Sequence, residues 1–472
     1  MHRGNLAAEY FKTVMLRLQF FFLSIALCGV PLVGDAQDAP ATREEVAELR
    51  ALVRQLQARV DVLEHGATPV QPAPPPVPAT VNAAPQLPLA ATAAATPEPP
   101  ASWNPTVNVG FDGYYAYNFN SPIGRANLLR AYDVSSNSFS INQANVIVES
   151  APDPDHGKRF GARVDLQWGQ ATQTLQGNSL NEPRPEIYRA LFQAYGTYVA
   201  PIGNGVTIDF GKWSSSIGIE GNYTKDQINY SRSYWFDYLP FYHMGLRMNY
   251  KVNDRFSVDY WVTNGTQQTE AYNGYKDQLF GFNAQPTKNV NWTVNYYLGQ
   301  EHPDVVYFLN GGAPPDAPTQ QGVPFEPIRP APQGKLHIFD SYATWQVSPK
   351  WLLAGEADWV IERLQTNSTP SQTMGGATYA RYQLLPKFSL AARTEYLNDR
   401  NGLYTGKAAS LTEATLTAAY QFGEGFQLRW EWRRDMSNQP LFYTDTLGLF
   451  AKHQTTATVG MICWFGPKHG AW

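Results

Sequence analysis

Apolar and polar side chains alternate strictly along residues 241–252, and this alternation limits what the chain can fold into. Arg247 and Lys251 fall on one parity of the segment. The other parity is wholly apolar and consists of Tyr242, Met244, Leu246, Met248, Tyr250 and Val252. Successive side chains of a β-strand point to opposite faces, so we predict a strand with one apolar and one charged face.

The same alternation recurs from Trp103 to the C-terminus, where we expect about sixteen strands. The connections between them alternate between short turns and long loops. A soluble secreted β-protein is not expected to keep this order of connections, whereas an outer-membrane barrel is. In such a barrel the apolar face of each strand meets lipid and the charged face meets a water-filled lumen. We therefore predict an all-β fold over 103–472, a transmembrane antiparallel β-barrel of about sixteen strands.

The first 36 residues are typical of an export signal. Arg3, Lys12 and Arg17 precede the apolar stretch Leu18–Val33, and small residues follow at a plausible cleavage site before Gln37. No later run approaches the roughly 18 apolar residues of a spanning helix. A membrane-embedded mature chain must therefore be a closed barrel, the other structure that satisfies its backbone hydrogen bonds in lipid.

Two segments separate the signal from the barrel. Residues 37–66 carry a heptad repeat, and we predict a periplasmic coiled coil between chains rather than a helix packed on its own protein. Its core positions are Val46, Leu49, Val53, Leu56, Val60 and Leu63. Valine at a with leucine at d favours two strands, while Leu52 at g permits three. Residues 67–102 are rich in Pro and Ala and cannot bury a core, which predicts a linker.

Charged residues concentrate on the polar parity of the predicted strands. The apolar parity cannot face water, so these charges must line a common aqueous interior, and a barrel of this size leaves an open channel. The predicted pore-lining residues are Arg159, Arg163, Asp165, Arg189, Asp209, Arg247, Lys251, Asp259, Arg393, Glu395, Arg429, Glu431 and Arg433. Their signs are nearly balanced, so the sequence leaves the ion preference open.

The third long connection, residues 214–240, is the candidate constriction loop. An external loop that exposed its many aromatic side chains to water would be unusual, so we expect it to fold into the pore. The alternative is that it packs on a neighbouring subunit. The charged residues predicted to act at the constriction are Glu220, Lys225, Asp226, Arg232 and Asp237.

The sequence gives no indication of an enzyme. It contains no nucleophile-elbow, P-loop or zincin motif. The eight histidines are scattered without ligand spacing, so we expect neither a metal nor a cofactor. A formal net charge of −4 argues against a nucleic-acid partner.

Several short stretches are similar to one known family. They are Arg130–Asp133, Asn137–Ala144, Phe210–Trp213, Gly218–Gly221, Tyr230–Tyr234 and Pro240–Gly245. Through them, residues from about 104 to 472 resemble the beta-barrel porin family described as OmpL-like. The resemblance implies an outer-membrane porin of a Gram-negative envelope, inserted by the barrel-assembly machinery, for passive diffusion of small hydrophilic solutes or ions. Porin analogy favours a homotrimer over a dimer. The alternative function is a structural anchor that tethers the outer membrane to the cell wall through the coiled coil.

Overall fold

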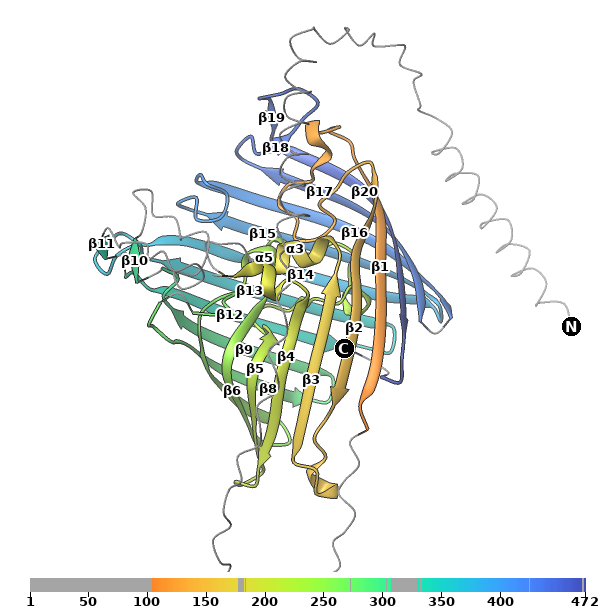
Figure 1. Ribbon diagram of the computed structural model, residues 1–472. Coiled ribbons are helices and arrows are strands. Elements are labelled where there is room, and N and C mark those ends of the chain that lie inside the picture. The colour runs from red at the N-terminus through yellow and green to blue at the C-terminus, as the bar shows by residue number, and fades with distance from the viewer. Residues whose placement is uncertain are drawn as a thin grey trace, which may run out of the picture. The chain divides into compact units, whose positions relative to one another are not determined.

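Sixteen long strands close into one antiparallel barrel in the computed structural model (Figure 1). The structure describes residues 104–176, 182, 184–271, 273–302, 304–306, 329–330, 333–423, 425–468 and 471–472. Each long strand pairs with the next one along the chain, and the last closes onto the first. The prediction of a sixteen-stranded antiparallel barrel is confirmed. The predicted coiled coil, Val46, Leu49, Val53, Leu56, Val60 and Leu63 included, lies outside the described residues, as do the signal and linker segments.

The strands follow one another in chain order around the barrel. The first eight are β1 (Thr106–Asn118), β2 (Ser138–Ser150), β3 (Phe160–Trp168), β4 (Leu191–Ala200), β5 (Val206–Ser214), β6 (Tyr242–Asn253), β7 (Phe256–Thr263) and β8 (Asp277–Thr287). The others are β9 (Val290–Gly299), β12 (Leu336–Gln346), β13 (Trp351–Glu362), β14 (Ser371–Leu385), β15 (Phe388–Asp399), β16 (Ala409–Gly423), β17 (Phe426–Ser437) and β20 (His453–Phe465).

The connections between the long strands contain two short β-ribbons and several short helices. Two short ribbons pair β10 (Val305–Val306) with β11 (Arg329–Pro330) and β18 (Phe442–Tyr443) with β19 (Phe450–Ala451). The helices are α3 (Gln170–Leu175), α4 (Pro185–Tyr188) and α5 (Tyr234–Tyr238), with 3-10 turns η1 (Ile123–Arg125), η2 (Pro154–His156) and η3 (Thr224–Asp226). Among the described residues, no helix combines the length and apolar character needed to cross a bilayer.

Short and long connections alternate around the barrel. Residues 254–255 are all that join β6 to β7, and residues 386–387 join β14 to β15, whereas 215–241 separate β5 from β6. All short turns therefore lie on one rim and all long loops on the other, as the sequence predicts. This alternation is the plan of outer-membrane barrels.

Apolar side chains are exposed on the outer face of the wall and polar side chains are buried on its inner face, as a barrel in lipid requires. On β3, the apolar side chain of Val164 is 40% exposed, while Arg163 beside it is 7% exposed. The same inversion holds on β5, where Phe210 is exposed and Asp209 is buried. A water-soluble sheet would bury its apolar parity. The polar parity of this barrel faces inward, and its apolar parity faces outward, where hydrocarbon can cover it.

Aromatic side chains gather on the outer face close to the short turns. Phe160 stacks on Tyr198 with ring centroids 4.8 Å apart, and Trp351 lies 4.7 Å from Tyr382. Each pair joins neighbouring strands at the same height. Such rings form the interfacial girdles of transmembrane barrels, where their amphipathic bodies sit at the level of the lipid headgroups.

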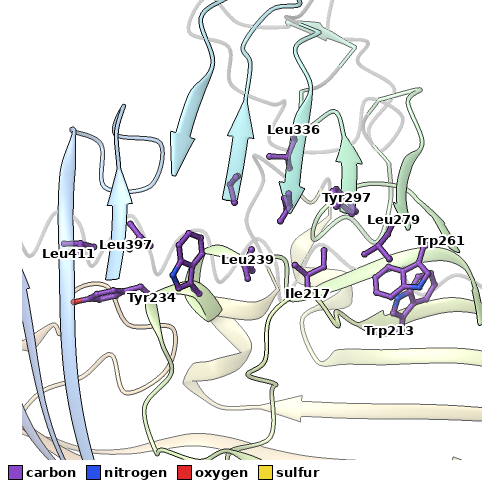
Figure 2. Close-up of a cluster of buried hydrophobic side chains, with 13 residues drawn as sticks. Trp213, Ile217, Tyr234, Leu239, Trp261, Leu279, Tyr297, Leu336, Leu397 and Leu411 are labelled. Carbon is purple, nitrogen blue, oxygen red and sulfur yellow. The ribbon is translucent and has the colours of Figure 1, made fainter. Parts of the chain in front are cut away.

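The inner face is not polar throughout, because an inner apolar collar lies toward the long-loop ends of the strands. It consists of Trp213, Trp261, Leu279, Tyr297, Leu336, Ile338, Val360, Leu397 and Leu411. In Figure 2, Leu397 and Leu411 lie near Tyr234 at one end of this cluster, and Trp261 and Trp213 lie at the other. The collar gives apolar parts of the β5–β6 connection a surface on which to pack.

Candidate pore and its internal loop

The long connection between β5 and β6, residues 215–241, lies inside the barrel and is called the internal loop below. Ser233 is the N-cap of its helix α5, and the Ser233 hydroxyl accepts the N–H of Phe236 at 3.0 Å. The buried side chains of Ile217, Trp235 and Leu239 pack on the inner apolar collar. Figure 1 shows α5 within the outline of the barrel.

One side of the internal loop is hydrogen-bonded to β1, β2 and β3. The hydroxyl of Tyr230 donates to the carboxylate of Asp112 at 2.7 Å. The side-chain amide of Gln143 donates to the carbonyl oxygen of Asn222 at 2.9 Å. The hydroxyl of Tyr223 donates to Asp165. These contacts place polar wall residues in direct contact with the loop rather than with water.

The other side of the internal loop is bound to β15 and β17. Glu431 accepts the backbone N–H groups of Tyr230 and Ser231 at 2.6 and 2.9 Å. Glu395 accepts the N–H of Tyr234 at 2.8 Å. The loop therefore spans the interior from one part of the wall to another.

Arginines of the wall donate hydrogen bonds to backbone carbonyl oxygens of the internal loop. Arg393 donates to the carbonyl oxygen of Ser231 and Arg429 to that of Asn229, both at 2.8 Å. Arg433 donates to the carbonyl oxygen of Arg232. Buried charges are stable when they are paired and hydrogen-bonded. Arg393 and Arg433 meet both conditions, and Arg429 is held by hydrogen bonds to carbonyl and amide oxygens.

The charged residues predicted at the constriction have mostly structural contacts. Glu220 pairs with Arg393 at 2.8 Å, and Lys225 pairs with Asp226 at 2.7 Å. Arg232 is buried and donates to the carbonyl oxygens of Asn222 and Tyr230 within its own loop. The structure therefore places these charged side chains inside the barrel, where several of them form ion pairs or hydrogen bonds that hold the internal loop in place.

Asp237 differs from the other charged residues of the internal loop. It lies half-buried in α5, and burial raises its pKa from 3.8 to about 6, while the positive charge of Arg433 opposes that rise. The carboxyl of Asp237 therefore changes its charge near neutral pH.

Sequence reasoning missed several members of the wall network. Glu413 pairs with Arg393 at 3.1 Å, and Asp435 pairs with Arg433 at 2.8 Å. Asp435 also pairs at 2.6 Å with Arg130, which comes from the connection between β1 and β2. Asp435 shares the inward parity of the predicted Arg433 on β17, and Glu413 lies on the inward face of β16 opposite the predicted Glu395, so the alternation could have found both. Nothing in the sequence indicates the position of Arg130.

One predicted pore-lining residue is not on the wall. Arg189 is predicted to line the pore, which requires a strand at this position, but β4 begins at Leu191. Pro185 instead starts the short helix α4, and Arg189 lies at its C-terminal end, half exposed and paired with Glu186. The placement of Arg189 in the wall is wrong, because a proline at the first helical position favours a helical turn there.

The other predicted pore-lining residues divide into two groups. Those on β3, β15 and β17 are buried against the internal loop and each other: Arg163, Asp165, Arg393, Glu395, Arg429, Glu431 and Arg433. We call this part of the wall the filled side. Arg159, Arg247 and Asp259 remain half-buried, and the side chain of Lys251 is 57% exposed. Asp209 is buried and pairs with Arg247 at 2.7 Å.

The accessible part of the interior lies toward the short-turn ends of β4–β9 and β12–β14, and we call it the open side. A cavity of about 350 Å³ opens there, lined on the inner face by Asn249, Lys251, Ser257, Asn283, Asn291 and Thr293. Its lining is almost wholly polar on that face. Arg381 on β14 is half-buried at the same level.

The end of the chain touches the internal loop from the short-turn side. The N–H of Trp472 donates to Asp226 at 3.1 Å, and its ring lies 5.8 Å from that of Tyr223 in an edge-on arrangement. The ammonium of Lys225 lies 4.5 Å from the centroid of the Trp472 ring. Lys468 pairs with Glu149 of β2 at 2.8 Å. No sequence pattern indicates these contacts.

An apolar outer face, an aromatic girdle, a polar interior and an inward-folded loop define a channel-forming outer-membrane β-barrel. The sequence profile of one family matches residues 106–465. The chain belongs to this family, which is described as "Putative beta-barrel porin-2, OmpL-like". It is thus a porin of the outer membrane, a passive diffusion channel and not an enzyme.

Solved structures with similar barrels include a trimer form of OmpT from Vibrio cholerae, which is 11% identical with a TM-score of 0.45 over 77% of this chain and 99% of OmpT. The outer-membrane channel DcaP of Acinetobacter baumannii is 10% identical, with a TM-score of 0.46 over 77% and 96%. An anion-selective porin from Comamonas acidovorans is 9% identical, with a TM-score of 0.46 over 77% and 99%. No curated protein sequence matches the chain.

Proposed function

We propose that small hydrophilic solutes and ions cross this porin along the open side of the barrel, with a preference for anions. The observation that carries the proposal is the unequal exposure of the inner face. Polar side chains of the filled side are buried by the internal loop, whereas those of the open side line a cavity. In this proposal the internal loop is the constriction, because it occupies the interior that the solute would otherwise use.

The charges of the open side favour anions. Among the described residues, Lys251 and Arg381 are accessible there, Arg159 lies beside it immediately before β3, and the accessible acid is Asp259. Arg247 is already paired with Asp209. Lys251 pairs with the exposed turn residue Asp254, and such exposed pairs are weak. A cleft lined by an excess of one sign concentrates ions of the other sign, and lysines and arginines select anions in pores.

Planar bilayers test this proposal directly. Purified protein should give stepwise conductance, and its reversal potential in a KCl gradient should correspond to a preference for Cl⁻ over K⁺. The double variant Arg247→Glu with Lys251→Glu should shift that potential toward cation selectivity. Lys387→Glu makes the same type of change in an exposed turn between β14 and β15, and should leave the potential as it was. A silent bilayer or a cation-selective parent protein would overturn the proposal.

We further propose that the barrel assembles with copies of itself, most simply as a trimer, and that residues 37–66 form a periplasmic coiled coil. The heptad supports this assembly, although three heptads alone are marginally stable and need chains that are already held together. The Pro/Ala-rich segment 67–102 would act as the spacer. Chemical cross-linking of the protein in membranes should yield trimers and no larger ladder.

The predicted coiled coil also favours a second function, in which the barrel anchors the envelope to the cell wall. Deletion of residues 37–102 separates the two functions. If permeability persists while envelope integrity fails, tethering is the main task of the N-terminal part. If both remain as in the parent strain, the segment has no anchoring role.

A further inference from the structure

We propose that Asp340, Glu356 and Asp358 form a site for a divalent cation inside the barrel, and that the cation is Ca²⁺. Asp340 lies on the inner face of β12, and the other two lie on the inner face of β13. One carboxylate oxygen from each of the three lies within 4.8 Å of the others. This proposal stands on side-chain geometry and does not depend on which solutes the channel passes.

The three carboxylates have no cationic partner among the described residues. Asp340 and Asp358 are directly opposed across the β12–β13 pair, and Glu356 lies two residues before Asp358 on the same face. Within the part of the chain that the structure describes, no basic side chain forms an ion pair with any of them; Arg393 on β15 pairs with Glu220 and Glu413 instead. Like charges that face each other across a sheet are destabilising unless something neutralises them.

The hydrogen bonding of Asp358 points to a missing ligand. Asp340, Glu356 and Asp358 are 2%, 7% and 4% exposed. Neither carboxylate oxygen of Asp358 accepts a hydrogen bond from an N–H or hydroxyl group among the described residues, and one oxygen of Asp340 also lacks such a donor. A buried acid that is not paired normally finds donors, so these oxygens, aimed at the other carboxylates, are free to bind a cation.

Another buried carboxylate of the same barrel, that of Asp435, differs from Asp358 because hydrogen-bond donors surround it. Asp435 accepts hydrogen bonds from Arg130, Arg433, Tyr234 and Gln454. The difference between Asp435 and Asp358 is therefore not one of burial. It is the presence of donors around one acid and their absence around the other.

The start of the internal loop closes over the three carboxylates. The carbonyl oxygen of Ser216 accepts hydrogen bonds from Asn295 at 3.1 Å and from Tyr342 at 3.2 Å. Gly218 has φ +88°, and a Cβ at this position would lie 3.2 Å from Glu356. A larger residue would crowd the site, so glycine allows the loop to approach it closely.

The ligand chemistry selects Ca²⁺ among the common cations. The site offers only oxygen atoms, which hard cations prefer, whereas zinc favours nitrogen and sulfur. Mg²⁺ gives up its water reluctantly, and this site is nearly closed to solvent. Three carboxylates carry more negative charge than a monovalent ion can balance. The histidine pattern of the sequence argued against a metal, but it does not bear on a site made of carboxylates.

Equilibrium dialysis of the full-length protein in detergent, after treatment with EDTA, tests the proposal with Ca²⁺ as the probe. The parent protein should bind one Ca²⁺ per chain with a dissociation constant on the order of 10⁻⁴ M or lower. Asp358→Asn should weaken that binding about tenfold or more. Asp153→Asn removes the same charge from an exposed turn and should bind as the parent does.

A thermal measurement on the parent protein keeps the test independent of the variants. Adding Ca²⁺ after EDTA should raise the midpoint of unfolding, because a ligand that binds only the folded state stabilises it. The same concentration of Mg²⁺ should raise it less. Absence of Ca²⁺ binding to the parent would overturn the proposal, and so would a Ca²⁺ effect that is equally large in Asp358→Asn, since the ion would then bind elsewhere.

Discussion

Glu431, on the wall strand β17, accepts the backbone N–H of Tyr230, in the internal loop, at 2.6 Å. Its other carboxylate oxygen accepts the N–H of Ser231 at 2.9 Å. One buried side chain thus satisfies two consecutive backbone donors of a segment that has no regular structure there. Hydrogen bonds to charged groups contribute about 1.5–3 kcal/mol each, so this carboxylate is a principal anchor of the loop.

Replacing Glu431 should loosen the internal loop. Glu431→Gln puts an amide N–H₂ opposite one of the two backbone donors, so at least one hydrogen bond is lost. We expect larger and more variable single-channel currents, because the loop moves away from the wall. Glu186→Gln, in the exposed helix α4, is the control. Unchanged current amplitude and noise in Glu431→Gln would show that the loop is held by other contacts.

A charge on the outer face should destabilise the barrel more than a charge on the inner face. Val164→Arg faces hydrocarbon near the middle of β3, and we expect it to lower the free energy of unfolding by about 2–4 kcal/mol. Asn249→Arg points into the open side beside Asp259 and should cost far less. Urea unfolding in phospholipid vesicles measures both. Equal costs would contradict the assignment of faces.

The contact of Trp472 with the internal loop should contribute measurably to stability. Trp472→Ala removes the ring that meets Lys225 and Tyr223, and a cation–π contact alone is worth about 0.5–2 kcal/mol. Trp472→Phe keeps an aromatic ring in place and should retain part of this energy. Urea unfolding of the three proteins compares them, and identical midpoints would mean that the contact is not formed in the membrane.

The protonation of Asp237 predicts a pH dependence of stability. Its pKa is about 6 in the folded protein and 3.8 ordinarily, so between these values the folded state holds a proton that the unfolded state has released. The contribution of Asp237 is therefore most favourable below about pH 4 and is lost as the pH rises through 6. The difference in unfolding free energy between the parent and Asp237→Asn should change across that window. A difference that is constant from pH 3.5 to 7 would exclude this role.

The alternation of side chains predicted the barrel well because a period of two is a strong signal when both faces are constrained. In β6 the apolar parity must meet lipid, so Leu246 and Met248 cannot exchange places with Arg247. The prediction was weaker where local chemistry changes the backbone, as at Pro185, whose helical turn removes Arg189 from the wall.

The interior could be predicted only in outline, because its contacts join distant parts of the chain. Glu431 and Tyr230 are 201 residues apart, and no local pattern links them. Asp340 lies opposite Asp358 because of the register of β12 against β13, which the sequence does not indicate. The inner apolar collar could not be predicted either. Alternation indicates which side chains face inward, but it does not indicate which residues of the internal loop pack against them.

Labelling of single cysteines in proteoliposomes tests the central claim most directly. The background is Cys463→Ser, which removes the single cysteine found among the described residues. A charged maleimide that stays in water should modify Lys251→Cys, on the open side, rapidly. It should modify Met248→Cys, on the lipid face, and Thr417→Cys, under the internal loop, slowly or not at all. Rapid labelling of Met248→Cys together with protection of Lys251→Cys would contradict the account.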